Sequence, residues 1–212
     1  SIAYTPGVAT PCLEIAKNIN EAFELTSMKS TIAVITDGSA VLGLGNIGPV
    51  AALPVMEGKC ALFKRFAGLD AVPIVLGTQN TEEIISAIKA IAPTFGGVNL
   101  EDISAPRCFE IEERLKNELD IPIMHDDQHG TAIVVLAGLI NALKVRGQDK
   151  SKVKVVVNGA GAAGIAIIKL IYQYGFTNII VCDCKGIISN NREDLGTEKK
   201  ELSKIINKDK KD

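Results

Sequence analysis

Tryptophan is absent from this 212-residue sequence, and aromatic residues make up only 4% of it. The formal net charge is −2, so basic residues are not in excess. Few stacking side chains and no general attraction for phosphate argue against nucleic-acid or anionic-membrane partners. Apolar runs stop well short of the roughly 18 residues of a membrane span, and the first residues lack the basic and apolar regions of a signal peptide. We therefore expect an ordinary globular protein of the cytoplasm.

Cysteine and histidine are also scarce, with five and two residues respectively. The number of cysteines is odd, none has CxxC spacing, and no histidine stands near them in the pattern of a zinc site. We expect reduced thiols, which is the usual state in the cytosol. With 47% hydrophobic residues, the chain has enough apolar side chains for one large domain or for a domain and part of a second.

Two pairs of neighbouring acids end two short apolar runs, residues 98–100 and 121–124. The pairs are Glu101 with Asp102 and Asp126 with Asp127. The runs resemble buried strands, and residues 106–119 between them have the pattern of an amphipathic crossover helix. Because right-handed crossovers keep such strands parallel, both pairs should emerge at the same carboxyl edge of a sheet. Four carboxylates gathered there would repel one another unless a divalent cation lay between them.

A structural alternative exists for the first pair, because acids ahead of a helix that begins near Pro106 also favour its N-terminus. This alternative serves less well for the second pair, since Thr131 is already available as a helix cap. On extended backbone, neighbouring side chains point to opposite sides, so one ligand from each pair is expected. Oxygen ligands favour Mg²⁺ or Mn²⁺ over zinc. We interpret His125 and His129 as hydrogen-bonded structural residues.

The sequence GLGNIG at residues 43–48 contains a GxGxxG pattern, but its context is wrong for a dinucleotide site. The next strand, residues 72–76, ends without an acid, whereas the fingerprint needs one. We predict that these residues form a tight turn at the start of a helix over residues 49–66. Free backbone amides at this turn would bind an anionic substrate. Lys59 lies among apolar residues of that helix. It either extends its amine to solvent or faces the acidic edge, where burial would lower its pKa toward use as a general base.

A second GxGxxG pattern has the expected context. Residues 153–157 form a strand, a helical stretch follows the glycines, and residues 178–182 form a second strand that ends at Asp183. The glycines are Gly159, Gly161 and Gly164. This arrangement predicts a dinucleotide-binding βαβ unit. Asp183 would accept a hydrogen bond from the ribose 2′-hydroxyl, which slightly favours NAD, although Lys185 offers a cation for the 2′-phosphate of NADP.

These patterns predict an α/β protein with two domains. A parallel-sheet domain for substrate and metal occupies residues 1–130, and the first half of a Rossmann domain occupies residues 131–212. A complete dinucleotide domain has two βαβαβ halves, so this chain resembles part of a longer protein. The lysine-rich segment after Asp183 is predicted to be a solvated helix with a frayed end.

With these residues assembled, the chain resembles the malic enzymes, which oxidise and decarboxylate malate, and especially their shorter bacterial forms. The similarity extends over nearly the whole sequence. It rests on the segments YTPGVA, VITDGSAVLGLGNIGP, PVMEGK, PTFGGVNLEDISAPRCFEIE, HDDQHGTA and VVNGAGAAGIA.

The resemblance implies a role for each residue of a catalytic site. Tyr4 would be the general acid and Lys59 the general base, with Asp126 beside the lysine to position and tune it. The metal would be held by three residues, Glu101, Asp102 and Asp127, so both members of the first pair are ligands and the spacing argument is overridden there. The substrate would be malate, the nucleotide NAD or NADP, and the assembly a homodimer or a larger homo-oligomer.

Two departures from the family pattern limit these implications. Larger eukaryotic members have a substrate-binding arginine where this chain has Ala40, so either the metal and the GLGNIG amides or another group such as Arg107 must bind that carboxylate. The later cofactor-domain segments of the family have no counterpart before Asp212. The alternative function is therefore a non-catalytic fragment that binds metal or serves assembly. The sequence leaves open whether Tyr4 serves its own subunit or a neighbouring one.

Overall fold

The computed structural model describes residues 1–207 and contains two compact units. The first unit comprises residues 1–103 and 110–124, and the second comprises residues 104–109 and the chain from residue 125 onward. The expected boundary between residues 130 and 131 lies inside a helix. Strands and helices alternate along the chain, so the predicted α/β class is confirmed.

The elements up to the last strand of the first sheet are α1 (Ala9–Lys17), η1 (Ile19–Glu21), α2 (Ala22–Leu25), η2 (Met28–Ser30), β1 (Thr31–Thr36), α3 (Pro49–Leu62), the π-helical turn η3 (Phe63–Ala67), β2 (Asp70–Val75), α4 (Thr81–Ile91), η4 (Ala92–Thr94), β3 (Gly97–Leu100), α5 (Arg107–Glu118) and β4 (Ile123–His125). They are followed by α6 (Asp126–Arg146), η5 (Lys150–Lys152), β5 (Lys154–Asn158), α7 (Ala162–Tyr174), β6 (Asn178–Asp183), β7 (Gly186–Ile187) and α8 (Thr197–Ser203).

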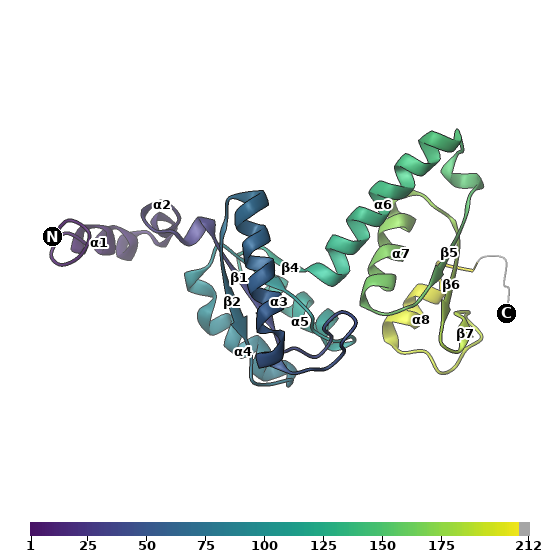
Figure 1. Cartoon of the computed structure of the whole chain (residues 1–212), viewed down its shortest axis with the longest axis horizontal. Helices are drawn as coiled ribbons and strands as arrows, with labels where there is room; N and C mark the ends of the chain where they lie inside the picture. The colour runs from purple at the N-terminus through teal and green to yellow at the C-terminus, as the bar shows by residue number, and fades with distance from the viewer. Residues whose placement is uncertain (208–212) are drawn as a thin grey trace. The chain divides into compact units, whose positions relative to one another are not determined.

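A four-stranded sheet with the order β2-β1-β3-β4 forms the centre of the first unit (Figure 1). β1 pairs in parallel with both β2 and β3, and Ile35 of β1 is opposite Leu100 of β3. The last four residues of β1 and all four of β3 are buried, as expected for continuous apolar runs covered on both faces. The acids that follow β3 therefore emerge beside the end of β1, at the carboxyl edge that the sequence predicted.

Helix α4 shows why the helices of this unit could be located from sequence. Asn80 caps it, because its Oδ1 accepts hydrogen bonds from the amides of Glu82 and Glu83. Three isoleucines at helical spacing, Ile84, Ile85 and Ile88, are buried. The strands and helices expected in this unit all form, with ends that differ by a few residues.

The start of α6 differs from the expectation. Thr131 was the cap that the sequence offered for this helix, but the helix begins at Asp126. Asp126 and Asp127 therefore lie in its first turn, where acids interact favourably with the helix dipole. The argument that neighbouring residues point to opposite sides of extended backbone does not apply to this pair.

The second unit contains a sheet with the order β5-β6-β7, in which β5 and β6 are parallel and β7 is antiparallel to β6. Together, β5, α7 and β6 form the βαβ unit with which a Rossmann domain begins, as predicted. The core includes Ile168, Phe176 and Val181, all fully buried. It also includes Leu202 and Ile206, so the prediction of a solvated tail is wrong for this segment. Apolar residues at these two positions secure α8 despite its many lysines, and the last five residues of the tail lie outside the described part of the chain.

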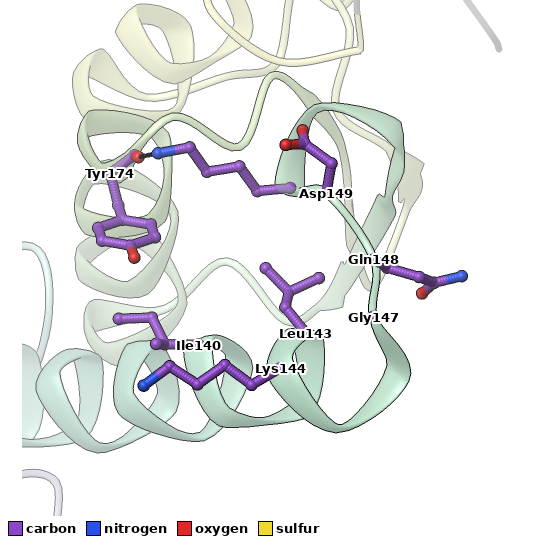
Figure 2. A pocket seen from close by; sticks show the side chains of 8 residues that line it. Ile140, Leu143, Lys144, Gly147, Gln148, Asp149 and Tyr174 are labelled. Carbon is purple, nitrogen blue, oxygen red and sulfur yellow. Dashed lines mark hydrogen bonds between the residues drawn. The ribbon is translucent and has the colours of Figure 1, made fainter.

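The segment that links α6 to β5, residues 147–152 (the linker), is held in place by its own side chains. Gly147 ends α6, and a pocket of about 350 Å³ lies between this end, the linker and Tyr174 at the end of α7 (Figure 2). Lys150 donates a hydrogen bond to the carbonyl oxygen of Tyr174 at 2.5 Å, and its Nζ lies 4.3 Å from the centre of the tyrosine ring. The linker is therefore attached to α7 within the second unit.

Helix α6 is the one helix in the described chain that is long and apolar enough to cross a membrane by length and composition. Its leucines at positions 136, 139 and 143 pack against the core of the second unit. Packing accounts for part of its apolar composition, because only 11% of the apolar window is buried within the described chain.

Candidate active site

The carboxyl edge of the first sheet is built by backbone hydrogen bonds that join the ends of β1 and β3. The amide of Glu101 donates to the carbonyl of Ile35 at 2.9 Å, and the amide of Ala40 donates to the carbonyl of Asp102 at 2.9 Å. The loop after β1 is also held locally, because both the amide and the hydroxyl of Ser39 donate to Oδ1 of Asp37. Glu101 and Asp102 are thereby fixed at the point where the predicted site begins.

Glu101 is a buried carboxylate with two identified partners. The residue is 6% exposed, and its Oε2 lies 3.1 Å from Nζ of Lys59 and accepts a hydrogen bond from Nδ2 of Asn99 at 2.8 Å. Of the two interpretations of Lys59, the structure supports the one in which it faces the acidic edge. Its side chain is only 21% exposed. The neighbouring Cys60 is not a thiolate nucleophile, because burial raises the pKa of its thiol.

Asp102 has an unusual backbone conformation for a residue with a side chain. Its φ is +54°, in the left-handed region, and the residue is 3% exposed. A non-glycine residue in this region costs on the order of 1–3 kcal/mol, although Asp and Asn tolerate it best. Such strain is concentrated at functional sites, and here it orients a buried carboxylate.

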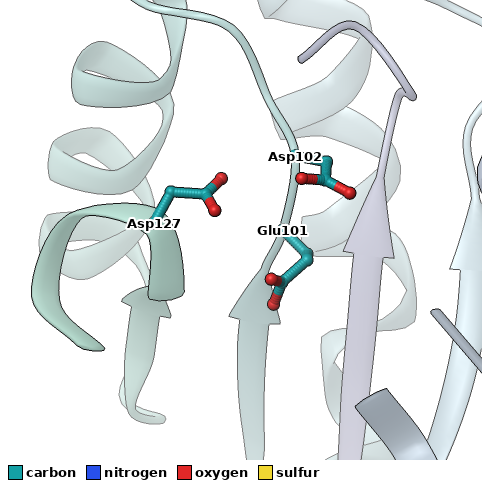
Figure 3. Close-up of side chains that lie close together, drawn as sticks. All are labelled: Glu101, Asp102 and Asp127. Carbon is teal, nitrogen blue, oxygen red and sulfur yellow. The ribbon is translucent and has the colours of Figure 1, made fainter. Parts of the chain in front are cut away.

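Three of the four predicted acids come together at this edge (Figure 3). Glu101, Asp102 and Asp127 each offer one oxygen, and these oxygens lie within 4.8 Å of one another. Asp127 follows β4, a strand of the same sheet, by two residues. The Nε2 atom of the buried His125 lies 3.9 Å from Asp127 Oδ2, which is too long for a hydrogen bond, so the hydrogen-bonded structural role expected for this histidine stays a prediction.

The fourth predicted acid, Asp126, lies against the backbone of its own helix. A Cβ atom built on Gly130 would come within 2.4 Å of Asp126 Oδ1, so the glycine one turn later provides the space for this carboxylate. The conformation of Asp126 therefore depends on Gly130, which explains the use of glycine inside a helix, where it otherwise costs roughly 1 kcal/mol.

The first glycine cluster does not offer the free amides that the sequence predicted. In the loop after β1, the amides of Leu44 and Gly45 donate to the carbonyl of Val41, and those of Ile47 and Gly48 donate to the carbonyl of Gly38. Because these four amides are used within the loop, its main function is to close the turn before α3. The hypothesis that they bind a substrate carboxylate is wrong for these four groups.

The second glycine cluster has the geometry of a nucleotide site. The third glycine, Gly164, lets α7 approach β5 closely, because a Cβ there would come within 2.0 Å of the carbonyl oxygen of Gly159. Gly161 caps α7 and has open space at its Cβ position, so a phosphate can approach the helix N-terminus. The amide of Gly159 donates to the carbonyl of Cys182, which aligns the loop with the end of β6.

Asp183 ends β6 as expected, but cations that the sequence analysis assigned to a solvated tail surround it. Oδ1 accepts hydrogen bonds from the Lys185 amide at 3.0 Å and Arg192 Nη1 at 2.8 Å. Oδ2 accepts from Arg192 Nη2 at 3.3 Å and Lys199 Nζ at 2.8 Å. Arg192, followed by Lys199, holds the pKa of this carboxyl well below its usual range. Four donors fill the lone-pair positions of the carboxylate, so a ribose hydroxyl must displace one of them.

Tyr4 does not join the site within its own chain. It is 73% exposed in the segment before α1, and this segment leads to the amino end of β1, whereas the carboxylates lie at the carboxyl end of the sheet. Three residues that contact the site residues could not be singled out from sequence: Asn99, Arg192 and Lys199. Asn99 gave no signal because it lies within the short, continuously buried run of β3, and charge alone did not distinguish the other two.

A parallel α/β unit with buried carboxylates, followed by a dinucleotide fingerprint, is typical of α/β proteins that bind a nucleotide cofactor. Two family models match the chain: the malic enzyme N-terminal domain over residues 1–116, and the malic enzyme NAD-binding domain over residues 128–211. The chain belongs to the malic enzyme family.

Characterised relatives are similar over the whole chain. It is 59% identical to the bifunctional malic/malolactic enzyme of Bacillus subtilis over 100% of this chain and 52% of the relative. It is 57% identical to the NAD-dependent malic enzyme of Geobacillus stearothermophilus, covering 99% of this chain and 44% of that one. For the NADP-dependent malic enzyme of Escherichia coli, the identity is 48% over 100% of this chain and 28% of the relative. The chain thus spans about half or less of the length of these relatives.

Solved structures show the same fold. The crystal structure of the NAD-dependent malic enzyme of Thermotoga maritima superposes with a TM-score of 0.95 at 50% identity, covering 98% of this chain and 56% of that one. The malic enzyme of Pyrococcus horikoshii gives a TM-score of 0.93 at 51% identity, covering 97% and 49%. These similarities confirm the predicted order of a malic domain followed by the start of a Rossmann domain.

Proposed function

We propose that the protein containing these residues is a malic enzyme that converts L-malate to pyruvate and CO₂ while reducing NAD or NADP. The observation that carries the proposal is the ion pair between Lys59 and the buried Glu101, next to two further carboxylates. In its neutral form this lysine can take a proton from a substrate held at the same edge, and a cation bound by the three acids would offset their charge and so favour the neutral form.

The acids at this edge fit a divalent cation. Three carboxylate oxygens within 4.8 Å of one another match the coordination shell of such an ion, which is roughly 4–5 Å across. Glu101 and Asp102 are buried, where like charges are costly, and oxygen ligands select Mg²⁺ or Mn²⁺. Glu101, Asp102 and Asp127 are therefore the proposed metal ligands.

In the proposed reaction, each catalytic residue either transfers one proton or holds one charged group. A cation held by Glu101, Asp102 and Asp127 would supply positive charge beside the substrate oxygens, and a nicotinamide bound in the second unit would supply the acceptor for the hydride of C2. Lys59 takes the proton of the C2 hydroxyl as malate becomes oxaloacetate. After CO₂ leaves, Tyr4 of a neighbouring copy of the chain gives a proton to C3 of the resulting enolate, which yields pyruvate. Asp126 positions Lys59, and Asn99 holds Glu101 through its amide.

The nucleotide is proposed to bind at Gly159, Gly161, Gly164 and Asp183. An acid at the end of β6 is typical of NAD sites, so NAD remains slightly favoured. Lys199 and Arg192 neutralise this acid, however, and Lys185 adds another cation nearby. We therefore expect measurable turnover with both nucleotides and faster turnover with NAD. Five free thiols are consistent with the proposed cytoplasmic location.

The proposal is tested by malate-dependent formation of NADH or NADPH in the complete protein. We expect activity with Mg²⁺ or Mn²⁺, loss of activity with EDTA, and recovery when the metal is added back in excess. A protein that binds Mn²⁺ but neither nucleotide, and shows no turnover, would support the alternative of a non-catalytic metal-binding or assembly component.

Gly130→Ala tests the role proposed for Asp126. The new Cβ would displace the Asp126 carboxylate, because the two cannot lie within 2.4 Å of each other. We expect kcat to fall about tenfold or more, since small displacements of a positioning group slow the chemical step. The free energy of unfolding should change by less than about 1 kcal/mol, because alanine is favoured over glycine inside a helix.

Gly138→Ala is the matched control for this substitution. Gly138 lies two turns later in α6, and a Cβ there meets nothing within 4 Å. This variant should retain full activity and be slightly more stable in urea denaturation. Equal activity of the two variants would contradict the role of Asp126 in positioning Lys59.

A further inference from the structure

Asn99 is a buried polar residue within an apolar strand. It lies in β3, whose four residues are all buried, and it is itself 2% exposed. Its Oδ1 atom is buried and accepts no hydrogen bond from the residues that the structure describes. Burying an amide without all its partners costs free energy, so an apolar side chain would suit this strand better. The stability of the sheet therefore does not explain the amide at position 99.

The other half of this amide is turned to Glu101. Side chains two residues apart on extended backbone lie on the same side, which brings positions 99 and 101 together. Nδ2 of Asn99 donates a hydrogen bond to Oε2 of Glu101 at 2.8 Å. Figure 3 shows the Glu101 side chain turned back beside the strand that it follows. Because β3 has β1 on one side and β4 on the other, the backbone that carries this donor is held from both sides.

Lys59 uses the same oxygen of Glu101. Its Nζ lies 3.1 Å from Oε2, the atom that also accepts from Asn99. A carboxylate oxygen has two lone pairs, and these two donors fill them. Glu101 can then offer a cation only its other oxygen, Oε1. Lysine has a long side chain that can follow a moving carboxylate, whereas asparagine has a short one, so Asn99 is the contact that fixes this orientation.

The number of oxygens that Glu101 offers bears on the choice of ion. Ca²⁺ takes about 6–8 oxygen ligands and often binds both oxygens of a carboxylate. Mg²⁺ requires nearly octahedral geometry at about 2.0–2.1 Å, and Mn²⁺ also suits six oxygen ligands. A glutamate restricted to one oxygen therefore favours the smaller ions, and a glutamate free to use both favours calcium.

We infer that Asn99 is a positioning residue that holds Glu101 in a one-oxygen binding mode and so makes the site prefer Mg²⁺ or Mn²⁺ to Ca²⁺. This inference rests on the proposed function, because it takes Glu101, Asp102 and Asp127 as the metal ligands. It adds a determinant of ion selectivity that is not itself a ligand. The buried amide is then explained by the ion that it selects.

Asn99→Leu tests this role, because leucine has the same branching at Cγ but no polar atoms. The measurement is titration calorimetry of the complete protein with Mn²⁺ alone and with Ca²⁺ alone, without malate or nucleotide. We expect the affinity for Mn²⁺ to fall about tenfold or more, as for other groups that orient metal ligands. The affinity for Ca²⁺ should fall much less or rise, so the ratio of the two Kd values should shift about tenfold toward calcium.

Asn99→Ala is the second variant, because it removes the amide without adding volume to the strand. It should shift the ratio in the same direction. An unchanged ratio in both variants, with Mn²⁺ and Ca²⁺ affected equally or not at all, would overturn the inference and leave the amide with a purely structural role. Wild-type protein that binds Ca²⁺ as tightly as Mn²⁺ would also contradict it.

Asn141→Leu is the matched control. Asn141 is exposed on α6, and its Nδ2 donates to the carbonyl of Ala137 at the same distance of 2.8 Å. This variant should bind both ions as the wild type does. The two proposals fail separately: a protein with the expected shift in ion preference but without malate turnover would overturn the proposed function and support the role of Asn99.

Discussion

Replacing Lys59 by arginine is expected to lower the turnover of malate about a hundredfold to ten-thousandfold, the range that a general base contributes. Arginine keeps the positive charge beside Glu101 but does not lose its proton at accessible pH. In wild type, Lys59 Nζ lies 3.1 Å from Glu101 Oε2. Arginine at position 59 can still form an ion pair with Glu101, but it cannot accept a proton from the substrate. The measurement is kcat and kcat/KM for malate in the complete protein, with saturating metal and nucleotide.

The comparison with Lys59→Ala separates proton transfer from charge. Alanine leaves the buried Glu101 without its lysine, so this variant should also lose stability, by roughly 1–3 kcal/mol in denaturant. The arginine variant should lose much less. If Lys59→Arg retained a tenth or more of the wild-type kcat, the lysine would act as a fixed charge and not as a base.

Lys64 provides the matched control. It lies five residues after Lys59, its side chain is 62% exposed, and it pairs with the exposed Asp70 at 2.7 Å. Surface pairs of this kind contribute less than about 1 kcal/mol. Lys64→Ala should therefore leave both the turnover of malate and the thermal midpoint close to the wild-type values.

Asp102→Asn should produce the largest change in metal affinity with the least change in backbone. Asparagine tolerates the left-handed conformation at φ +54° as well as aspartate does, so the substitution removes charge and little else. We expect the affinity for Mn²⁺ to fall about a hundredfold or more, because even groups behind the ligands contribute 10–100-fold. Titration calorimetry of the complete protein with Mn²⁺ alone measures this effect.

Thermal unfolding provides a second measurement of metal binding that is independent of calorimetry. Without metal, Asp102→Asn should be at least as stable as the wild type, because one of three clustered carboxylates is neutralised. With Mn²⁺ at a hundred times the wild-type Kd, the wild type should gain about 2.7 kcal/mol and the variant almost nothing. A variant that binds Mn²⁺ normally would rule out Asp102 as a ligand. The exposed Asp70→Asn should behave as wild type in both measurements.

The carboxylate edge could be predicted from sequence because strong local signals determine it. The strands β1 and β3 are short apolar runs with acids or turn residues directly after them, and parallel pairing brings such ends together. Asp127 was found by the same rule, although the helix after β4 begins five residues before Thr131. The helix dipole favours acids in the first turn of a helix. Asp126 and Asp127 were therefore also a signal for the start of α6, which was interpreted as the end of a strand.

Other features depend on tertiary contacts that have no local signal. Leu202 and Ile206 are buried among lysines because they face the core of the second unit, and a charge count cannot show which side of a short helix is covered. Asp183 was correctly placed at the end of β6, but its partner Arg192 comes from a loop without periodicity. The position of Tyr4 relative to the site is the hardest feature to predict from sequence, since its own chain does not bring it to the site.

The backbone of Asp102 has a consequence for how such a protein loses its activity over evolutionary time. A codon for aspartate becomes a codon for asparagine by a single nucleotide change, and asparagine is among the few residues that tolerate a left-handed position. Most mutations at this buried position would also disturb the fold, but this one removes the charge alone. A descendant that had lost the proposed metal site in this way would still fold, and it would be indistinguishable in architecture from its ancestor.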